Sequence, residues 1–379
     1  MKWEKVKLED VCDVFAGSSA PQSKTHFSSD GLLFVRVSDL ATKQNRLLNS
    51  TRDKINPKEV NNLRLVKAKA GTTIFPKSGA AILTNSRALL GVDMYIVSHL
   101  AALSPKENIE PTYIYFFMLG VDMKKYVPNV SYPSLNLKAI KKIKIAIPFK
   151  NGKPDLATQK RIVDRLDRFY SLQEKTESEI SIADNLFESV CKKDFEKLKN
   201  SSDHKKIDDV CNVVKGQFPT LKTPKGKFTF VVTAEKRKSA NDYQLNEEAV
   251  CIPLVSSTGH GHASLHRIHY EKGKFALANI LVALIPKDKK RILTKYLYYY
   301  LSFYKNELLV SLMRGAANVT IPLYKINGVV VEIPKIIEQR RVISTLEKIE
   351  KLKHLLARNG VLSKQLFQSA LNHAFQGKL

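Results

Sequence analysis

Cysteine and tryptophan are scarce in this chain of 379 residues, which contains four cysteines and one tryptophan. The cysteines, at positions 12, 191, 211 and 251, form no Cys-x-x-Cys pair, so the sequence predicts neither a disulfide framework nor a cysteine-rich zinc site. Cys12 and Cys211 each lie beside valine in a short apolar run, where we expect a small buried side chain. The chain therefore depends on an ordinary hydrophobic core.

Long hydrophobic runs are also missing. No apolar stretch reaches the roughly 20 residues that a membrane-spanning helix needs. The first residues, Met1–Lys5, lack the apolar segment of a secretory signal peptide, so we expect a cytoplasmic protein. With 44% hydrophobic residues, the chain has enough apolar side chains for ordinary cores, and its length predicts two to three domains.

The sequence also lacks the motifs of several enzyme classes. It has no Asn/Asp-Pro-Pro-aromatic motif of an amino-methyltransferase, because its Asn56-Pro57 pair is followed by Lys58. It has no GxxxxGK[ST] phosphate loop, so it encodes no ATP hydrolysis. Pro154-Asp155 has no nearby acid-x-Lys partner, which argues against a metal-dependent nuclease site. We therefore predict a non-catalytic chain.

Acidic residues are too few to balance the basic ones. The chain has 36 Asp and Glu against 62 Lys and Arg, a net charge of +26. Residues 1–149 hold 22 basic and 12 acidic side chains, residues 201–334 hold 20 and 11, and residues 335–379 hold 9 and 3. Residues 150–200 are almost neutral, with 11 and 10. A general surplus of surface lysine would not spare one segment, so a polyanionic partner is the favoured interpretation.

What the sequence does contain is a long internal repeat. Residues 8–17 match 207–216, residues 135–148 match 321–334, and residues 159–187 match 339–367. The period of 180 to 199 residues is far longer than a solenoid unit. The repeat therefore indicates the duplication of a whole domain together with its connector.

Short apolar runs between Gly, Pro and Asn predict strands in the first half, at Leu32–Val37, Thr72–Phe75, Ala80–Leu83, Met94–Val97 and Ile143–Ile147. One helix is predicted at Pro111–Met118, and its repeat partner lies at Thr294–Leu301. Both helices are rich in aromatic residues, which at helical spacing favour a place in the core over stacking on bases.

Apolar residues recur three or four positions apart in residues 156–198 and 337–375, which predicts two helices of about forty residues, roughly 60 Å each. Asn359 and Gly360 predict a kink or a break in the second helix. The expected fold is α+β, with two similar mixed α/β domains and two long helices that pair as an antiparallel coiled coil with pseudo-twofold symmetry. Such a molecule suits the two half-sites of a DNA duplex, with the helices fixing their spacing.

Several motifs carry a resemblance to a known family. They are the Leu-Glu-Asp-Val opening at residue 8, the Ile-x-Ile-Pro strand ending at Pro148 and its counterpart ending at Pro334, the Gln-Arg-Arg helix start at Gln339, and the stretches 251–262 and 313–319. In these features the chain resembles, over its full length, the specificity (S) subunit of type I restriction–modification enzymes. The first half departs in one place, since Thr158 precedes Gln159 where Glu338 precedes Gln339.

The resemblance implies a layout of four parts. Residues 1–149 and 201–334 would be target recognition domains, while residues 150–200 and 335–379 would be the conserved spacer helices. Such a subunit would bind a bipartite target in double-stranded DNA and hold two methyltransferase subunits, with restriction subunits in the full complex and no membrane. S-adenosylmethionine, ATP and Mg are expected on the partner subunits, and no cofactor is expected on this chain.

Base edges are read by polar and basic side chains on loops and helix ends, while other basic residues hold phosphates. In the first domain we predict DNA contacts from Arg36, Ser38, Lys77, Ser78, Asn85, Arg87, Asn129, Ser131 and Tyr132. In the second we predict contacts from Lys236, Arg237, Lys238, Ser256, Ser257, His260, His262, Arg267, Arg314 and Asn318. For each residue, a solvated surface position or a turn former is the alternative.

Four histidines crowd one stretch, at positions 260, 262, 266 and 269. A metal site is the alternative interpretation, but no cysteine or acid joins them at ligand spacing, and Glu271 is the nearest carboxylate. We favour groove contacts or a plain surface loop, and predict no metal site.

Two other functions stay open. The first is the recognition part of a fused restriction–methylation system, although the missing methyltransferase motifs argue against it unless the catalytic part lies on another chain. A coiled-coil scaffold that binds acidic proteins is the second alternative, and a silent paralogue without a functional methyltransferase partner would have the same sequence features.

Overall fold

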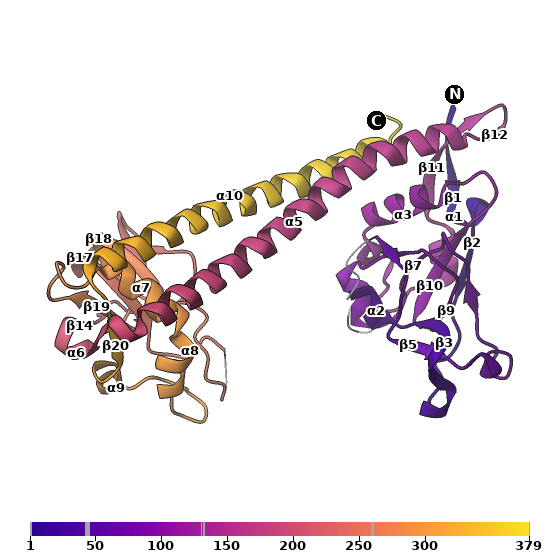
Figure 1. Cartoon of the computed structure of the whole chain (residues 1–379). Helices are drawn as coiled ribbons and strands as arrows, with labels where there is room; N and C mark the ends of the chain where they lie inside the picture. The colour runs from indigo at the N-terminus through magenta and orange to yellow at the C-terminus, as the bar shows by residue number, and fades with distance from the viewer. Residues whose placement is uncertain (1, 42–45, 130, 132, 259–260, 379) are drawn as a thin grey trace. The chain divides into compact units, whose positions relative to one another are not determined.

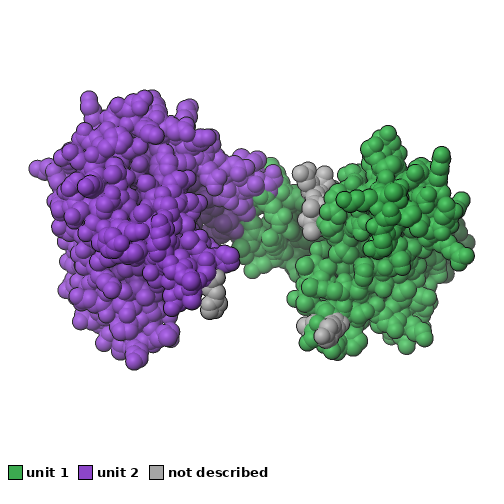
Figure 2. Space-filling model, turned by 90° about the horizontal axis from the view of Figure 1, so that it is seen from below, with its two compact units in different colours: residues 1–177, 359–379 green, residues 178–358 purple. Residues whose placement is uncertain are grey.

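The structure is a computed structural model that describes residues 2–41, 46–129, 131, 133–258 and 261–378. It divides into two compact units, residues 1–177 with 359–379 and residues 178–358 (Figure 2). Each unit contains a mixed α/β domain and part of each long helix. Among the described residues, no helix is both long and apolar enough to cross a membrane.

In the first unit, β1 (Lys2–Lys7) pairs antiparallel with β11 (Lys144–Lys150), which also pairs with β12 (Lys153–Pro154). A five-stranded sheet has the order β2 (Cys12–Ala16), β10 (Leu100–Pro105), β7 (Thr73–Pro76), β8 (Ala88–Leu90) and β4 (Leu47–Leu48). A four-stranded sheet has the order β5 (Asp53–Ile55), β3 (Phe27–Val35), β9 (Met94–Ile96) and β6 (Lys67–Ala68). The helices are α1 (Leu8–Val11), α2 (Val37–Ala41), α3 (Pro111–Gly120) and α4 (Leu137–Lys141), with short 3-10 turns at Lys24–His26, Pro57–Glu59, Ala80–Thr84 and Met123–Tyr126.

In the second unit, β13 (Asp203–Lys206) pairs antiparallel with β20 (Val330–Ile333). A six-stranded sheet has the order β14 (Cys211–Lys215), β19 (Leu281–Pro286), β17 (Leu245–Pro253), β18 (His269–Leu277), β15 (Phe228–Val231) and β16 (Lys238–Ala240). The helices are α6 (Ile207–Val210), α7 (Thr294–Phe303), α8 (Lys305–Leu308) and α9 (Leu323–Asn327), with 3-10 turns at Lys199–Ser201 and Val310–Leu312.

Four of the five predicted strands are present, in β3, β7, β9 and β11. The predicted strand at Ala80–Leu83 is wrong, because these residues form a 3-10 turn. Gly79, with φ at 78°, turns the chain before it, and Ile82 N donates to Gly79 O at 3.1 Å. A glycine in this conformation costs little, so the local turn prevails over the strand preference of the apolar side chains.

The two long helices are confirmed, as α5 (Leu156–Leu198) and α10 (Ile336–Ala374) (Figure 1). The predicted break at Gly360 does not occur, since α10 continues through it. A single glycine inside a helix costs only about 1 kcal/mol relative to alanine. Packing of the neighbouring turns offsets that cost, because Ser363 and Phe367 are buried.

Within each unit, a segment of α5 lies beside a segment of α10 that runs the opposite way. In the first unit, Lys364 pairs with Glu177 at 3.1 Å, and the rings of Tyr170 and Phe367 lie 5.4 Å apart. In the second unit, Asp184 of α5 pairs with Lys353 of α10 at 2.7 Å. The predicted antiparallel pairing is therefore present in both units.

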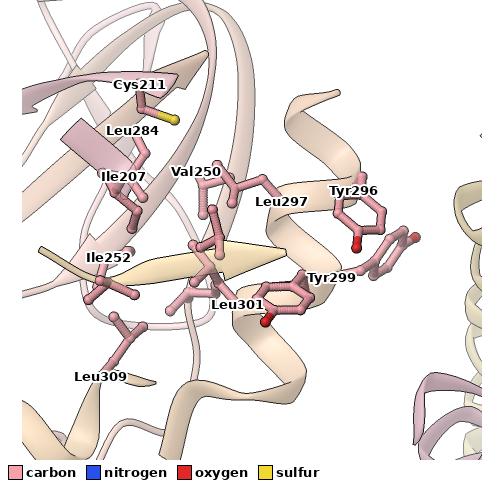
Figure 3. Packing of buried hydrophobic residues seen from close by; sticks show 14 of the residues in the cluster. Ile207, Cys211, Val250, Ile252, Leu284, Tyr296, Leu297, Tyr299, Leu301 and Leu309 are labelled. Atoms are coloured by element: carbon pink, nitrogen blue, oxygen red, sulfur yellow. The ribbon is translucent and has the colours of Figure 1, made fainter. Parts of the chain in front are cut away.

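The aromatic helices α3 and α7 form the centres of two hydrophobic cores, as predicted. Tyr113 and Phe116 of α3 are fully buried. In α7, Leu297 points toward strand residues such as Val250, while Tyr296 and Tyr299 are buried on the other side of the helix (Figure 3). Fully burying a large apolar side chain contributes about 1.5–3 kcal/mol, so these helices contribute much of the stability of their units.

All four cysteines are free and buried. Burial raises the pKa of the Cys12, Cys191 and Cys211 thiols to about 12. Such thiols stay protonated at neutral pH and are poor nucleophiles. The cysteines are therefore core residues.

One glycine in each unit is required by a close approach of two backbone segments. A Cβ on Gly17 would lie 2.0 Å from Ile96 O, and a Cβ on Gly216 would lie 2.0 Å from Ala278 O. No other residue fits these positions without moving a neighbouring strand. The repeated glycine of the sequence therefore marks the same packing in both halves.

Candidate nucleic-acid interface

Three segments of the first unit meet just after β7. Lys77 N donates to His99 O at 2.9 Å, while Leu135 N donates to Lys77 O at 2.7 Å. Gly79 N donates to Pro133 O at 2.9 Å. Backbone hydrogen bonds therefore hold residues 77–79 between the turn before β10 and the segment before α4.

The second unit repeats this arrangement just after β17. Leu254 N donates to Ile280 O at 2.8 Å, and Ile321 N donates to Leu254 O at 2.8 Å. Ser256 N donates to Val319 O at 2.9 Å. Residues 254–256 are thus the structural counterparts of residues 77–79.

The two counterparts share their backbone but no side chain. An antiparallel bridge joins Ser78 to Ser134 in the first unit and Val255 to Thr320 in the second. The triplets read Lys-Ser-Gly and Leu-Val-Ser, so the internal repeat of the sequence does not show their equivalence. Each unit therefore presents different side chains on one shared backbone arrangement.

The loops around residues 77–79 carry most of the polar residues predicted in the first unit. Ser78 Oγ lies 2.6 Å from His99 Nδ1. Asn129 and Ser131 are exposed, and Asn129 Oδ1 accepts from Ser131 N at 2.8 Å. Ser38 is exposed at the start of α2, and the predicted Tyr132 lies outside the described residues.

The prediction that Arg87 contacts DNA is wrong, because its side chain is only 1% exposed. Its Nε donates to Met118 O at 3.2 Å, and its Nη2 donates to Val121 O at 3.2 Å. The guanidinium also lies over the ring of Phe75, 5.2 Å from its centroid. Burial lowers the pKa of Arg87 to about 10, so it keeps its charge at neutral pH and satisfies that charge inside the protein.

Asn85 belongs to the same hydrogen-bond network as buried Arg87. Its backbone is left-handed, with φ at 54°, and its Oδ1 accepts from Arg87 Nη2 at 2.6 Å and from Met123 N at 3.3 Å. These bonds fix the turn that follows residues 80–84. Asn85 remains half-buried, so its predicted DNA contact stays a prediction.

Two other predicted arginines are held by the protein framework. Arg36 pairs with Asp53 and lies over the ring of Phe27, 5.5 Å from its centroid. Arg237 donates to Glu271 at 2.8 Å, and its Nη1 lies 2.9 Å from His269 Nδ1. Any DNA contact by these side chains would compete with their existing partners.

In the second unit, hydroxyl groups tie the loop after β17 into a compact turn. Ser256 Oγ donates to the carbonyl of His262 at 2.5 Å. Thr258 Oγ1 lies 2.8 Å from Ser264 Oγ, and Ser257 Oγ accepts a hydrogen bond from His266 N at 3.0 Å. These bonds fix the described residues 256–258 and 261–266 relative to one another, which lowers the entropic cost of recognition by these residues. The predicted His260 lies outside the described residues.

Arg314 and Asn318 lie on a turn of residues 314–320 that is hydrogen-bonded to the loop after β17. Arg314 N donates to Thr320 O and Thr320 N donates to Arg314 O, both at 2.9 Å. Gly315 has φ at 123°, and a Cβ there would lie 2.3 Å from Asn318 O. Arg314 and Asn318 are both exposed. Because Ser256 N donates to Val319 O at 2.9 Å, the structure brings together residues 256–258 and 314–320, which are far apart in the sequence.

The remaining predicted residues, Lys236, Lys238 and Arg267, surround Arg237. Lys236 and Lys238 are exposed, and Arg267 pairs with Glu235 at 3.3 Å. Thr258 lies in the loop from Ser256 to His262 that the sequence predicts as a DNA contact, and it shares the hydroxyl contacts of Ser256.

The histidine stretch divides between loop and core. His262 and His266 are exposed, whereas His269 is 4% exposed and contacts Arg237. Burial and the neighbouring arginines lower the pKa of His269 to about 4, so its ring is neutral at pH 7. Within the described part of the chain, no group of three metal-ligating side chains comes together.

Comparisons with known proteins agree with this geometry. The family model described as type I restriction modification DNA specificity domain matches residues 1–182 and again 200–359. The type I restriction enzyme MjaIX specificity subunit of Methanocaldococcus jannaschii is 27% identical over 149 residues, which is 38% of this chain and 34% of that protein. The match thus spans about a third of that relative's length.

Two solved structures have the same fold. A type I restriction-modification S subunit from M. genitalium aligns with a TM-score of 0.62 and 14% identity, covering 99% of this chain and 96% of the other. A chain from a structure described as complex assembly and conformational transition of the type I R-M system aligns with a TM-score of 0.59 and 17% identity, covering 100% of this chain and 98% of the other.

Proposed function

The chain belongs to the type I restriction modification DNA specificity family, and from this premise we propose that it is the sequence-recognition subunit of a type I restriction–modification complex. The observation that carries the proposal is the shared backbone arrangement at residues 77–79 and 254–256, which presents different side chains in each unit. One duplicated scaffold would then read two different half-sites of one bipartite DNA target.

Recognition would combine two kinds of contact in each recognition domain (residues 1–149 and 201–334). The net charge of +26 supports general attraction to phosphates, which is strong at low salt and carries no sequence information. Exposed polar groups such as Asn129, Arg314 and Asn318, together with half-buried Ser78, can bond to base edges. We assign sequence reading to these loops and not to Arg87.

The long helices would dock two methyltransferase subunits, which in turn join the restriction subunits. Apolar side chains on the helices are exposed in both units: Leu172, Val361, Leu362 and Leu366 in the first, and Ile182, Leu186, Leu352 and Leu355 in the second. Ile182 is 62% exposed. Groups of exposed apolar residues mark interaction surfaces, and a catalytic subunit is the partner that a recognition chain needs.

The chain itself would be non-catalytic, and it would act in the cytoplasm, where its target DNA lies. S-adenosylmethionine, ATP and Mg²⁺ would act on the partner subunits. The contribution of this chain is positional, because it would bring the bound methyltransferases to the correct bases.

The paired helices would also set the gap between the half-sites. Matched insertions of seven residues, after Leu172 and in the facing part of α10, would lengthen the pair by about 10 Å. We expect the gap to grow by about three base pairs, at 3.4 Å each, with both half-sites unchanged. A changed half-site with an unchanged gap would contradict this role.

The deciding experiment is co-expression with a type I methyltransferase subunit from the same genome, followed by mapping of methylated adenines in the host genome. A bipartite motif, with two short defined halves around a fixed gap, is the expected result. A stable complex without methylation would instead indicate a silent paralogue or a scaffold.

A further inference from the structure

A fully buried glutamine occupies the first turns of each long helix. Gln159 of α5 and Gln339 of α10 are both 0% exposed, and they are equivalent in the internal repeat. Glutamine is mostly a surface residue, because its amide must find hydrogen-bond partners when it leaves water. Burial at both equivalent positions therefore indicates a specific set of partners.

In the first unit, the partners of Gln159 come from the chain just before α3. Its Oε1 accepts from Glu110 N at 3.0 Å, and its Nε2 donates to Asn108 O at 3.1 Å. Glu110 is the N-cap residue of α3, and Asn108 is left-handed, with φ at 62°. The glutamine thus ties the beginning of α5 to the beginning of the aromatic helix.

In the second unit, Gln339 makes the same connection to α7. Its Oε1 accepts from Leu293 N at 2.9 Å, and Leu293 is the N-cap residue of α7. Its Nε2 donates to Arg291 O and to Pro334 O, both at 2.8 Å. The amide therefore joins three segments: the approach to α7, the end of β20 and the first turns of α10.

Each recognition domain is thus attached to the helices at two places. Its aromatic helix packs along α5, where the rings of Phe116 and Tyr170 lie 5.8 Å apart in the first unit, and those of Phe195 and Tyr300 lie 5.4 Å apart in the second. The ring packing tolerates small rotations, because aromatic pairs are favourable in both offset-stacked and edge-to-face arrangements at centroid distances from about 4.5 to 7 Å. The glutamine bonds are directional and resist such rotations.

We propose that Gln159 and Gln339 are positioning residues that fix the angle of each recognition domain on its own long helix. They thereby restrict the bipartite target to a single gap length. The proposal rests on the proposed function and adds to it the device that makes the spacing sharp. Neither glutamine needs to touch DNA or the methyltransferase for this role.

The test uses the full chain co-expressed with its methyltransferase, and it maps methylated adenines for the wild type and for Gln339→Leu. The substitution keeps the apolar part of the side chain and removes all three hydrogen bonds. We expect both half-sites to keep their bases. Targets whose gap is one base pair longer or shorter should be methylated at least tenfold more often than by the wild type. Gln159→Leu should broaden the distribution of gap lengths in the same way.

Tyr296→Phe is the matched control. It removes a hydrogen bond of 3.2 Å from Tyr296 Oη to Glu332 O, which lies inside the second recognition domain and does not involve α10. This variant should lose stability and keep a single gap length. Gln339→Glu retains the acceptor for Leu293 N and loses the donor, so it should give a gap distribution between those of the wild type and Gln339→Leu.

A single gap length in Gln339→Leu, with methylation reduced as in Tyr296→Phe, would overturn the proposal and leave the glutamines as ordinary stabilising residues. Should Gln339→Leu fail to accumulate, Gln339→Glu decides in the same assay. A broadened distribution of gap lengths supports the proposal, and a single gap length overturns it. Failure of the proposed function is recognised separately, because the wild-type complex would then give no bipartite motif.

Discussion

The two recognition domains are most alike where they meet the helices and differ most in their sheets. At the helices, both place a buried glutamine and an aromatic helix in equivalent positions. Away from them, the first domain has a five-stranded and a four-stranded sheet, whereas the second has one six-stranded sheet. The attachment to the helices was therefore preserved after duplication, while the sheets and the loop side chains that would face different DNA sequences diverged.

The largest effect should come from the two equivalent glycines. Gly17→Val and Gly216→Val place a side chain where a Cβ would already lie 2.0 Å from a backbone oxygen. We expect each change to lower the free energy of unfolding by about 3 kcal/mol or more, because a strand must move. Denaturant unfolding of the full chain measures it.

Gly120→Ala is the control, since nothing lies within 4 Å of the added Cβ. It should change the free energy of unfolding by less than about 0.5 kcal/mol. If Gly216→Val were as mild as this control while Gly17→Val was severe, the two domains would not share the same constraint.

Acid should distinguish the two units, because His269 has no buried histidine counterpart among the described residues of the first unit. The folded-state pKa of His269 is lowered to about 4, below the ordinary value of about 6.5. Between these two pH values, His269 is protonated in the unfolded chain and neutral in the folded chain. The contribution of His269 to the free energy of unfolding is therefore fully present above about pH 6.5 and falls by roughly 3 kcal/mol as the pH drops to about 4.

Unfolding by urea at pH 7 and at pH 4.5 measures this loss. His269→Gln can still accept a hydrogen bond from Arg237 and cannot titrate, so its stability should depend less on pH than that of the wild type. An equal loss in both chains would show that the carboxylates, and not His269, determine the acid sensitivity.

Buried Arg87 and exposed Arg314 should separate stability from specificity. Arg87→Leu leaves the carbonyls of Met118 and Val121 without donors and should cost about 2–3 kcal/mol, with base preference unchanged. Arg314→Ala should change stability by less than about 0.5 kcal/mol. It should relax one base position in one half-site, a loss of about 1–3 kcal/mol of discrimination.

Thermal unfolding and methylation of targets with single-base changes measure both effects. Uniform weakening of all targets by Arg314→Ala would identify a phosphate contact instead of a base contact. Relaxation of one base position by Arg87→Leu would contradict its structural role.

The smallest effect should come from Lys77, whose counterpart Leu254 carries no charge. If Lys77 holds a phosphate, Lys77→Ala should weaken binding equally for all sequences and reduce the slope of log affinity against log salt by about 0.9. Titrations of the full complex at several salt concentrations measure this slope. An unchanged slope together with a relaxed first half-site would make Lys77 a base reader.

Much of the fold was predictable because helical periodicity is a strong signal over forty residues. It placed α5 and α10 to within one residue at each end. The failure at Ala80–Leu83 has a local cause, since the turn at Gly79 overrides four apolar side chains that suit a strand equally well. Local conformation that depends on one glycine is not visible in an apolar pattern.

The candidate site was less predictable, because residue type does not reveal burial. Arg87 and Arg314 are chemically identical, and only the fold shows that one is enclosed by backbone carbonyls and the other exposed. The equivalence of residues 77–79 and 254–256 was hidden for another reason. Backbone groups make the bonds that define it, and the side chains therefore left no shared pattern in the sequence.

This dependence on main-chain bonds has an evolutionary consequence. Because N–H and C=O groups hold residues 77–79 and 254–256 in place, exchanges of half-buried side chains such as Lys77 and Val255 for any residue except proline keep the backbone bonds, whereas Gly79 (φ 78°) and buried Leu254 stay constrained. Substitutions at such half-buried positions would accumulate without loss of the fold. New preferences can therefore arise by single exchanges, without passing through an unfolded ancestor.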